Sequence, residues 1–255
     1  MKMKIFLLNR AAFCWSVFGH ELPYGTNRTR ENLEYKAPTG RTRDVFFEAE
    51  GFFVPPMELP KTEHGGVSIV RGVRVQRIDA VARKAYLENG AVIAFEKCLL
   101  APGTETKRLP ELDKDEKVKQ RVLYLKSIDE FRRMDKACAS AKRITIVGGG
   151  FLASELAHSI KRKYPEMEVN QVFREVGPLA VALPEYFARY ANEEMRKFGV
   201  NVYSRATIKD VKATKSGVAL TVASGSTTKT IESDYVIAEG ATEVSSDCAK
   251  ASGFK

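Results

Sequence analysis

Histidine and cysteine are scarce in this sequence, and their scarcity excludes several kinds of catalytic site. The 255 residues contain three histidines and four cysteines. No two cysteines stand close enough in the sequence to form a local zinc cage or a Cys-x-x-Cys redox pair. Three histidines give little material for a histidine-based catalytic triad or a three-histidine metal centre. We therefore expect no metal site, and a reducing compartment suits the cysteines best.

Long apolar runs are also absent. No stretch approaches the roughly 18 to 20 apolar residues that a membrane-spanning helix needs, so we expect no membrane span. The first twenty residues carry Lys2, Lys4 and Arg10 but no acidic residue, which matches an organelle-targeting presequence in sign and amphipathic character. The alternatives are a stray strand or a start that does not belong to the fold. Residues 1–19 are therefore interpreted as a presequence or a non-native start, separate from the domains that follow.

Acidic residues are outnumbered by basic ones. The chain has 41 Lys and Arg against 32 Asp and Glu, which gives a formal net charge of +9. Such a surface attracts acidic partners, among them phosphates, nucleic acid and anionic membranes. The basic residues are dispersed in small groups, and such groups form solvated faces more often than specific nucleic-acid sites.

Regular secondary structure becomes easy to read from Ser127 onward. Ser127 and Glu130 form a capping box, and apolar residues then recur at helical spacing, so a helix is predicted there. The run "RITIV" (Arg143–Val147) is rich in β-branched residues and is followed directly by glycine. This pattern is typical of a buried parallel strand that leads into a tight turn.

The segment after this strand completes one strand-helix-strand-helix-strand half of a parallel dinucleotide-binding fold. Leu152, Leu156 and Ile160 lie on one face of a predicted helix, which Pro165 ends. Strands then alternate with helices, as in a right-handed parallel sheet. The further predicted elements are a strand at 169–173, a helix from Pro184 to Gly199, a strand at 200–203, and short strands at 208–213, 218–222, 228–232 and 234–243.

The first half of the chain contains the same series of elements. Two pairs of segments correspond to one another. The first pair is "GVSIVRGVRVQRID" (Gly66–Asp79) and "GVNVYSRATIKDVK" (Gly199–Lys212), and the second is "FEKCLLAPGTE" (Phe95–Glu105) and "SDYVIAEGATE" (Ser233–Glu243). Both copies run through a strand, a hairpin with a glycine turn and a final apolar strand that ends in small residues. This internal duplication predicts an α/β protein with two nested dinucleotide-binding folds of the Rossmann type.

The first copy lacks its glycine turn. By the spacing of the second copy, the turn is expected near residue 15, where the sequence reads "AAFCWSVFG". No G-x-G-x-x-G stands before Gly66, so the first fold is predicted to be incomplete. The predicted domains are a partial FAD-type domain at 20–109, an NAD-binding domain at 110–238 and the start of a return into the first domain at 239–255.

The glycine turn after Val147 has the chemistry that a dinucleotide needs. Gly148 allows the tight bend from strand to helix, Gly150 lets the backbone approach a pyrophosphate, and Ala153 is small enough for helix and strand to pack closely. The amides of residues 149–152 then point at the phosphates from a helix N-terminus. We expect dinucleotide binding here, and the alternative is a merely structural tight turn.

Two carboxylates accompany this turn. Glu175 follows the second strand and can accept hydrogen bonds from the ribose hydroxyls, which selects NAD over NADP. The neighbouring Arg174 is the competing feature, because an arginine there can accept a 2′-phosphate. Glu155 lies in the first turn of the helix, where it either stabilises the helix terminus or reaches the nicotinamide.

These residues together resemble a known family. "ITIVGGGFLASELA", "LPEYFARYANEEMRKFGVNV", "EKCLLAPGT" and "ELPYGTNR" are similar to segments of the apoptosis-inducing factors, which are mitochondrial flavoproteins of the two-dinucleotide oxidoreductase superfamily. The resemblance implies an FAD domain interrupted by an NADH domain and hydride transfer from NADH to FAD. It also implies residence in the mitochondrial intermembrane space and a pro-apoptotic role involving DNA after relocation to the nucleus.

The resemblance also assigns roles to individual positions. Phe151 matches the residue that shields the flavin-facing side, Glu155 the nicotinamide-side glutamate, and Arg132 an arginine that reaches the FAD. No catalytic residue is assigned. The residues that the resemblance and the glycine turn together assign to cofactor binding are Gly148, Gly149, Gly150, Phe151, Leu152, Glu155, Glu175 and Arg132.

The sequence departs from the family at positions that matter for the flavin. After "ELPY" it has "GTNRTREN" in place of the arginine, proline pair and lysine that help to hold FAD, and Val181 stands where the family has an NAD-contacting lysine. The Gly-Asp segment that closes the FAD site is also expected beyond Lys255. We therefore expect this chain to bind NAD but not FAD, and to be a binder rather than an active enzyme. The alternative function is that of a basic, pro-apoptotic DNA-binding protein without catalysis. The sequence does not decide whether the chain forms a homodimer.

Overall fold

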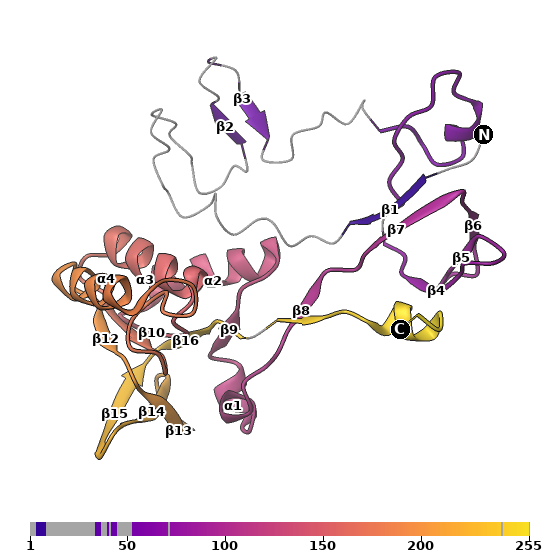
Figure 1. Cartoon of the computed structure of the whole chain (residues 1–255). Coiled ribbons are helices and arrows are strands. Elements are labelled where there is room, and N and C mark those ends of the chain that lie inside the picture. The colour runs from indigo at the N-terminus through magenta and orange to yellow at the C-terminus, as the bar shows by residue number, and fades with distance from the viewer. Residues whose placement is uncertain are drawn as a thin grey trace. The chain divides into compact units, whose positions relative to one another are not determined.

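The computed structural model describes residues 4–8, 34–36, 40, 42–44, 53–70, 72–240 and 242–254 (Figure 1). These residues form two compact units. Unit 1 contains the described residues up to Glu105 and those from Glu243 onward, and unit 2 is Thr106–Thr242. Unit 2 is therefore inserted into unit 1, and the nested α/β arrangement predicted from the duplication is confirmed. The sequence placed the limits of the inserted domain at residues 110 and 238.

Unit 1 repeats the strand plan of unit 2 in a reduced form. Three of its strands form an antiparallel sheet in the order β4-β5-β6, and β7 pairs in parallel with β1, with Leu8 opposite Ala101. The segment that ends the chain is joined to β4, because the amide of Ile78 donates a hydrogen bond to Ser252 Oγ at 2.8 Å. The elements of this unit are β1 (Lys4–Leu8), β2 (Glu34–Lys36), β3 (Thr42–Asp44), a 3-10 turn at Leu59–Lys61, β4 (Val75–Asp79), β5 (Lys84–Leu87), β6 (Val92–Ala94), β7 (Lys97–Ala101) and α5 (Asp247–Ala251).

The strand β1 pairs with β7 in parallel, as β10 pairs with β16 in unit 2. Leu8 lies opposite Ala101, just as Val147 lies opposite Ala238 in unit 2. The glycine turn of the first copy is expected near residue 15, within the segment that follows β1. The segment 9–33 lies outside the described residues.

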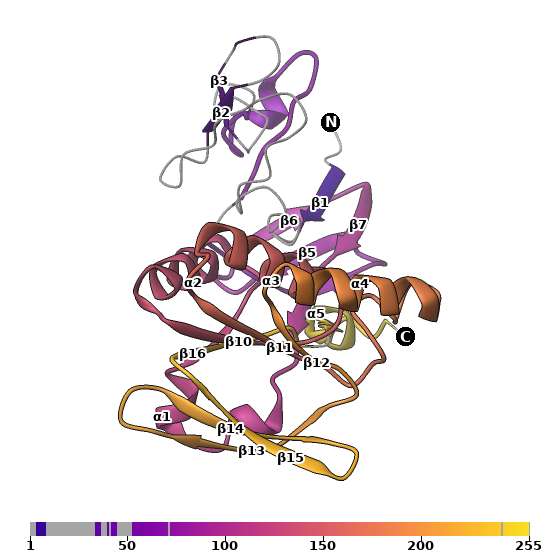
Figure 2. The same cartoon turned by 90° about the vertical axis from the view of Figure 1, so that its left-hand side faces the viewer.

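Unit 2 is a three-layer α/β domain. Its central sheet is parallel, in the order β12-β11-β10-β16-β9. Helices α2, α3 and α4 cover one face, and the antiparallel sheet β13-β14-β15 covers the other (Figures 1 and 2). The elements are a 3-10 turn at Pro110–Leu112, α1 (Glu116–Lys119), β9 (Val122–Tyr124), α2 (Ile128–Ser140), β10 (Arg143–Val147), α3 (Phe151–Lys163), β11 (Glu168–Val172), α4 (Glu185–Lys197), β12 (Asn201–Tyr203), β13 (Thr207–Ala213), β14 (Val218–Ser224), β15 (Thr227–Ser233) and β16 (Tyr235–Ala238). The strands β8 (Thr104–Thr106) and β17 (Thr242–Val244) pair with one another where the chain passes from one unit to the other.

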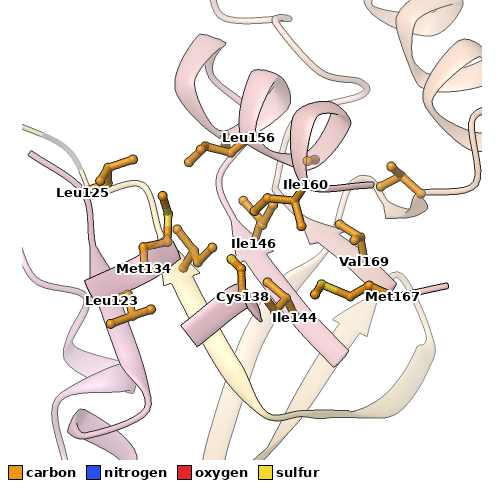
Figure 3. Packing of buried hydrophobic residues seen from close by; sticks show 14 of the residues in the cluster. Leu123, Leu125, Met134, Cys138, Ile144, Ile146, Leu156, Ile160, Met167 and Val169 are labelled. Carbon is orange, nitrogen blue, oxygen red and sulfur yellow. The ribbon is translucent and has the colours of Figure 1, made fainter. Parts of the chain in front are cut away.

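The alternation of side chains along the central strand explains the two covering layers. Ile144 and Ile146 of β10 are fully buried in the apolar cluster under the helices (Figure 3). Thr145 is buried in β10 as well, and its hydroxyl lies 2.8 Å from that of Ser233 at the end of β15. A second apolar cluster, which includes Leu220 of β14, fills the space beside the antiparallel sheet. A strand buried on both faces is therefore held by a core on each side.

The local signals in the sequence are confirmed. Ser127 is the N-cap of α2 and forms a complete capping box with Glu130. The helix predicted after Pro184 is present as α4, and Gly199 follows it with a φ of 94°. Two phenylalanines predicted for this helix are less buried than their spacing suggests: Phe187 of α4 is 48% exposed, and Phe198, the C-cap residue, is 39% exposed. Only Ala188, Asn192 and Met195 of this helix are buried.

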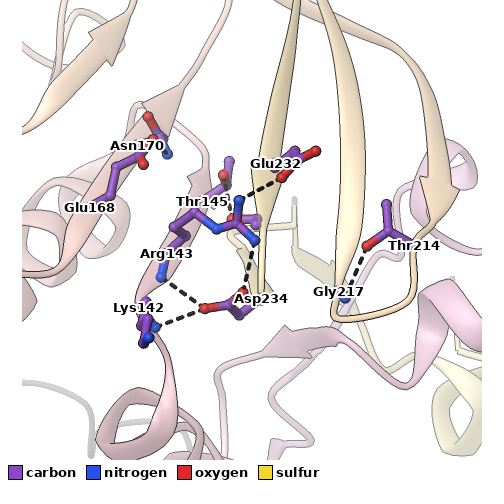
Figure 4. A network of polar contacts seen from close by, with 10 residues as sticks. Lys142, Arg143, Thr145, Glu168, Asn170, Thr214, Gly217, Glu232 and Asp234 are labelled. Atoms are coloured by element: carbon purple, nitrogen blue, oxygen red, sulfur yellow. Dashed lines mark hydrogen bonds and ion pairs between the residues drawn. The ribbon is translucent and has the colours of Figure 1, made fainter.

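A polar network ties β10 to the end of the antiparallel sheet (Figure 4). The carboxylate of Asp234 accepts hydrogen bonds from the amides of Lys142 (2.7 Å) and Arg143 (3.0 Å) and from the Arg143 guanidinium (3.3 Å). Partial burial on its own would raise the pKa of Asp234, but these donors and the positive charge of Arg143 outweigh it and lower the pKa. The ionised form of Asp234 is therefore stabilised by the fold.

We expect Asp234→Asn to lower the free energy of unfolding by about 1 to 2 kcal/mol at pH 7, because it removes the charge from these hydrogen bonds. The lowered pKa means that this stability is present above about pH 4, the pKa of an unfolded aspartate, and is lost as the pH falls through the folded pKa. Urea unfolding at pH 7 and at pH 3 measures the difference. The control is Asp210, whose side chain is 45% exposed and pairs with Lys212 at 3.6 Å, and Asp210→Asn is expected to change stability by less than about 0.5 kcal/mol. An equal loss for both variants at both pH values would contradict the role of Asp234.

Candidate dinucleotide-binding site

The glycine turn lies at the carboxyl end of β10, in the middle of the parallel sheet. Gly148 has a φ of 142°, which residues with a side chain rarely adopt. A Cβ added there would lie 3.2 Å from the Cβ of Ala153, which is fully buried in α3. The bend and the close packing of helix on strand therefore need a glycine and an alanine at these two positions, as predicted. Gln171 supports the turn from β11, because its Nε2 donates a hydrogen bond to the Gly148 carbonyl at 3.1 Å.

The N-terminus of α3 follows directly. Gly150 is the N-cap residue, and it has no side chain that could accept hydrogen bonds from the first amides of the helix. These amides have no partner within the helix itself, and they carry the positive end of the helix dipole. An anion at this point is stabilised by both effects.

In this structure the anion at the turn is Glu239. This residue follows β16, the neighbour of β10, and its carboxylate Oε2 accepts a hydrogen bond from the Gly150 amide at 3.0 Å. Its own amide donates to the carbonyl of Val147 at 2.8 Å. Partial burial raises the pKa of Glu239, and the charge of Glu175 acts in the same direction, whereas the amides of α3 act against them.

Glu239 is not among the site residues predicted from the sequence. Its side chain reaches the turn because β16 inserts beside β10, and the two hydrogen-bonded residues are 89 positions apart. A signal was present in the duplication: where Phe95–Glu105 is aligned with Ser233–Glu243, Glu239 stands opposite Ala101. A carboxylate in one copy and an alanine in the other indicates that this position differs in role between them.

Glu175 lies on the other side of the turn. Its Oε2 is 3.0 Å from the place where a Cβ on Gly149 would stand, so the structure brings this carboxylate to the glycine turn. The neighbouring Arg174 is exposed. The loop that follows Glu175 is itself bonded to the turn, because the amide of Leu179 donates to the carbonyl of Gly149 at 2.7 Å.

The other predicted residues lie on α3 and α2. Phe151 is 50% exposed at the first position of α3, and Leu152 and Glu155 are half-buried in the turn that follows. Arg132 lies on the exposed side of α2, where it pairs with Asp129 at 3.6 Å. Within the described ranges, no three or more Cys, His, Asp or Glu side chains gather in a way that could hold a metal ion. No helix among the described elements has the length and apolar character to cross a membrane.

The sequence profile of the pyridine nucleotide-disulphide oxidoreductases matches residues 6–255. The chain belongs to this family. Solved structures with a similar fold include the covalent putidaredoxin reductase–putidaredoxin complex, with a TM-score of 0.66, 17% identity and coverage of 81% of this chain and 48% of that one. The water-forming NADH oxidase from Lactobacillus brevis bound to NADH gives a TM-score of 0.61, 21% identity and coverage of 78% and 43%.

Curated members of the family include two apoptosis-inducing factors. The chain is 34% identical over 224 residues to putative apoptosis-inducing factor 1, mitochondrial, of Drosophila melanogaster, with 85% of this chain and 30% of that protein covered. It is 28% identical over 211 residues to apoptosis-inducing factor 1, mitochondrial, of Dictyostelium discoideum, with coverage of 80% and 37%. The resemblance to apoptosis-inducing factors is therefore confirmed, and the chain spans about a third of the length of these relatives.

Proposed function

We propose that unit 2 binds NADH at the glycine turn, and that the protein works as an NADH-dependent flavin oxidoreductase of the apoptosis-inducing factor kind. The observation that carries this proposal is the arrangement at the end of β10: a glycine turn that opens α3, with the carboxylate of Glu175 beside Gly149. The parallel sheet around it and the family relationship support the same function.

The residues of the turn fit a dinucleotide in most respects. The backbone at Gly148 and Gly150 has no Cβ that would keep a pyrophosphate away, and the first amides of α3 are the donors for its oxygens. Glu175 would accept hydrogen bonds from the adenosine ribose hydroxyls. The one feature that does not fit is the carboxylate of Glu239, which already accepts a hydrogen bond from the Gly150 amide.

The remaining assignments concern the nicotinamide and flavin side. Phe151 would shield the flavin-facing side, Glu155 would lie near the nicotinamide, and Arg132 would reach toward a flavin. Bound NADH supplies a hydride and bound FAD accepts it, while the protein provides binding and orientation. The expectation that the chain does not hold FAD depends on the missing first glycine turn and on the segment after "ELPY", both of which lie outside the described residues.

The cellular role is proposed from the relatives alone. Both apoptosis-inducing factors are mitochondrial by name, and on this basis we propose a mitochondrial location and a role in cell death. The net charge of +9 favours binding to DNA as the second candidate function. A titration of DNA affinity with salt separates the two functions, because binding that persists at physiological salt would support the second.

The proposed function is tested by Glu175→Ala. We expect the variant to bind NADH about 5- to 100-fold more weakly, because it loses an acceptor for two ribose hydroxyls whose hydrogen bonds are charge-assisted. Isothermal titration of the full chain with NADH measures the change. Glu166→Ala is the control, since Glu166 is exposed in the turn between α3 and β11, and its removal is expected to leave the affinity unchanged. If the unmutated chain bound NADPH as tightly as NADH, Arg174 rather than Glu175 would determine the choice of cofactor.

A further inference from the structure

The side chain of Glu239 fills the space that the glycines leave open. A Cβ added to Gly148 would lie 2.6 Å from Glu239 Oε2, and a Cβ added to Gly150 would lie 2.6 Å from Glu239 Oε1. Both carboxylate oxygens therefore stand against the turn. Oε2 also accepts the hydrogen bond of the Gly150 amide at 3.0 Å. The cradle that glycines usually leave open for a phosphate is occupied by a carboxylate of the chain itself.

We propose that Glu239 is an internal competitor of the dinucleotide: its carboxylate holds the amides at the start of α3, and NADH binds only after this side chain has moved away. The inference rests on the proposed binding of NADH at the glycine turn and adds a regulating residue to that site. Two negative groups that depend on the same amides repel one another, so the carboxylate and a pyrophosphate exclude each other.

The backbone on both sides of Glu239 is held in place, so the side chain must do the moving. The amide of Glu239 is bonded to the carbonyl of Val147 within the sheet, at 2.8 Å. Gly240 packs so tightly that an added Cβ would lie 2.2 Å from the carbonyl oxygen of Lys107. A rotation of the Glu239 side chain about its own bonds releases the amides without disturbing these contacts.

The competition depends on the charge of Glu239. Its carboxylate faces the amides of Gly150, Leu152 and Ala153 from α3 and the carboxylate of Glu175 from the end of β11. Partial burial and the charge of Glu175 raise its pKa, so it takes up a proton more readily than an ordinary glutamate. A protonated Glu239 is a weaker acceptor and no longer repels a pyrophosphate, and dinucleotide affinity therefore rises as the pH falls.

The test compares the full chain with Glu239→Gln and Glu239→Ala by isothermal titration with NADH at pH 7. Glutamine keeps the size and removes the charge, and alanine removes both. We expect Glu239→Gln to bind NADH about tenfold more tightly than the unmutated chain, and Glu239→Ala at least as tightly as that. Glu232→Gln is the matched control, because it removes the same charge at the other end of β10, where Glu232 pairs with Arg143, and it is expected to leave the affinity unchanged.

A second measurement needs no variant. ADP-ribose carries the same pyrophosphate without the nicotinamide, and the unmutated chain should bind it more tightly at pH 5.5 than at pH 7.5. The rise should be smaller in Glu239→Gln, because this variant no longer has the carboxylate that takes up the proton. Equal or weaker affinity in both Glu239 variants, together with identical pH profiles, would overturn the inference while the proposed function stands. If none of the chains bound NADH or ADP-ribose, the proposed function would fail and the inference with it.

Discussion

An alanine in place of Ile146 is expected to lower the free energy of unfolding by about 3 to 4 kcal/mol. Ile146 is fully buried in β10, the middle strand of the sheet, and belongs to the cluster under the helices (Figure 3). Truncation removes its apolar contacts and leaves a cavity that neighbouring strands cannot close, because β10 is bonded to β11 on one side and to β16 on the other. Urea unfolding followed by far-UV circular dichroism reports this loss, since α2, α3 and α4 are all in unit 2.

Two controls set the scale for this variant. Ile146→Val removes a single methylene and should lower stability by about 1 kcal/mol. Val81→Ala changes a side chain that is 96% exposed in unit 1 and should have almost no effect. A loss below about 1 kcal/mol for Ile146→Ala would show that α3 relaxes into the cavity and that the cluster is not tightly packed.

The elements of unit 2 could be predicted from the sequence because their signals are local. The capping box of Ser127 and Glu130 and the β-branched run of β10 depend on residues within a few positions of one another. The same holds for the turn itself, where Gly148 and Ala153 are needed for a bend and a close contact that the spacing already implies. The nested arrangement could be predicted because the duplication repeats a whole series of such signals.

The features that could not be predicted depend on contacts between distant segments. Glu239 reaches the glycine turn only because β16 lies beside β10, and the order of strands in a sheet does not follow from their order in the chain. The exposure of Phe187 and Phe198 has a related cause, since the side of α4 that faces the sheet is occupied by Ala188, Asn192 and Met195. The distance between a helix and a sheet depends on the side chains at their contact, and no periodicity in the sequence reports that distance.

Gly177 shows how such a close approach positions the candidate site, and Gly177→Ala is expected to lower the free energy of unfolding by about 3 to 4 kcal/mol. A Cβ on Gly177 would lie 2.1 Å from the carbonyl oxygen of Ala188, which is fully buried in α4. The atom in the way belongs to the backbone of a helix, so a rotation of a side chain cannot relieve the overlap. Either α4 or the loop that contains Gly177 must move.

The variant is also expected to bind NADH about tenfold more weakly, because the same loop carries Glu175 and bonds Leu179 to the carbonyl of Gly149. Urea unfolding and isothermal titration with NADH measure the two effects. Gly225→Ala is the control: Gly225 lies in the turn between β14 and β15 with a φ of 57° and open space around it, so an alanine there should cost about 1 kcal/mol from backbone strain alone. If Gly177→Ala lost no more stability than Gly225→Ala and bound NADH normally, α4 would be free to shift, and close packing of this loop on the helix would not be what holds Glu175 beside the glycine turn.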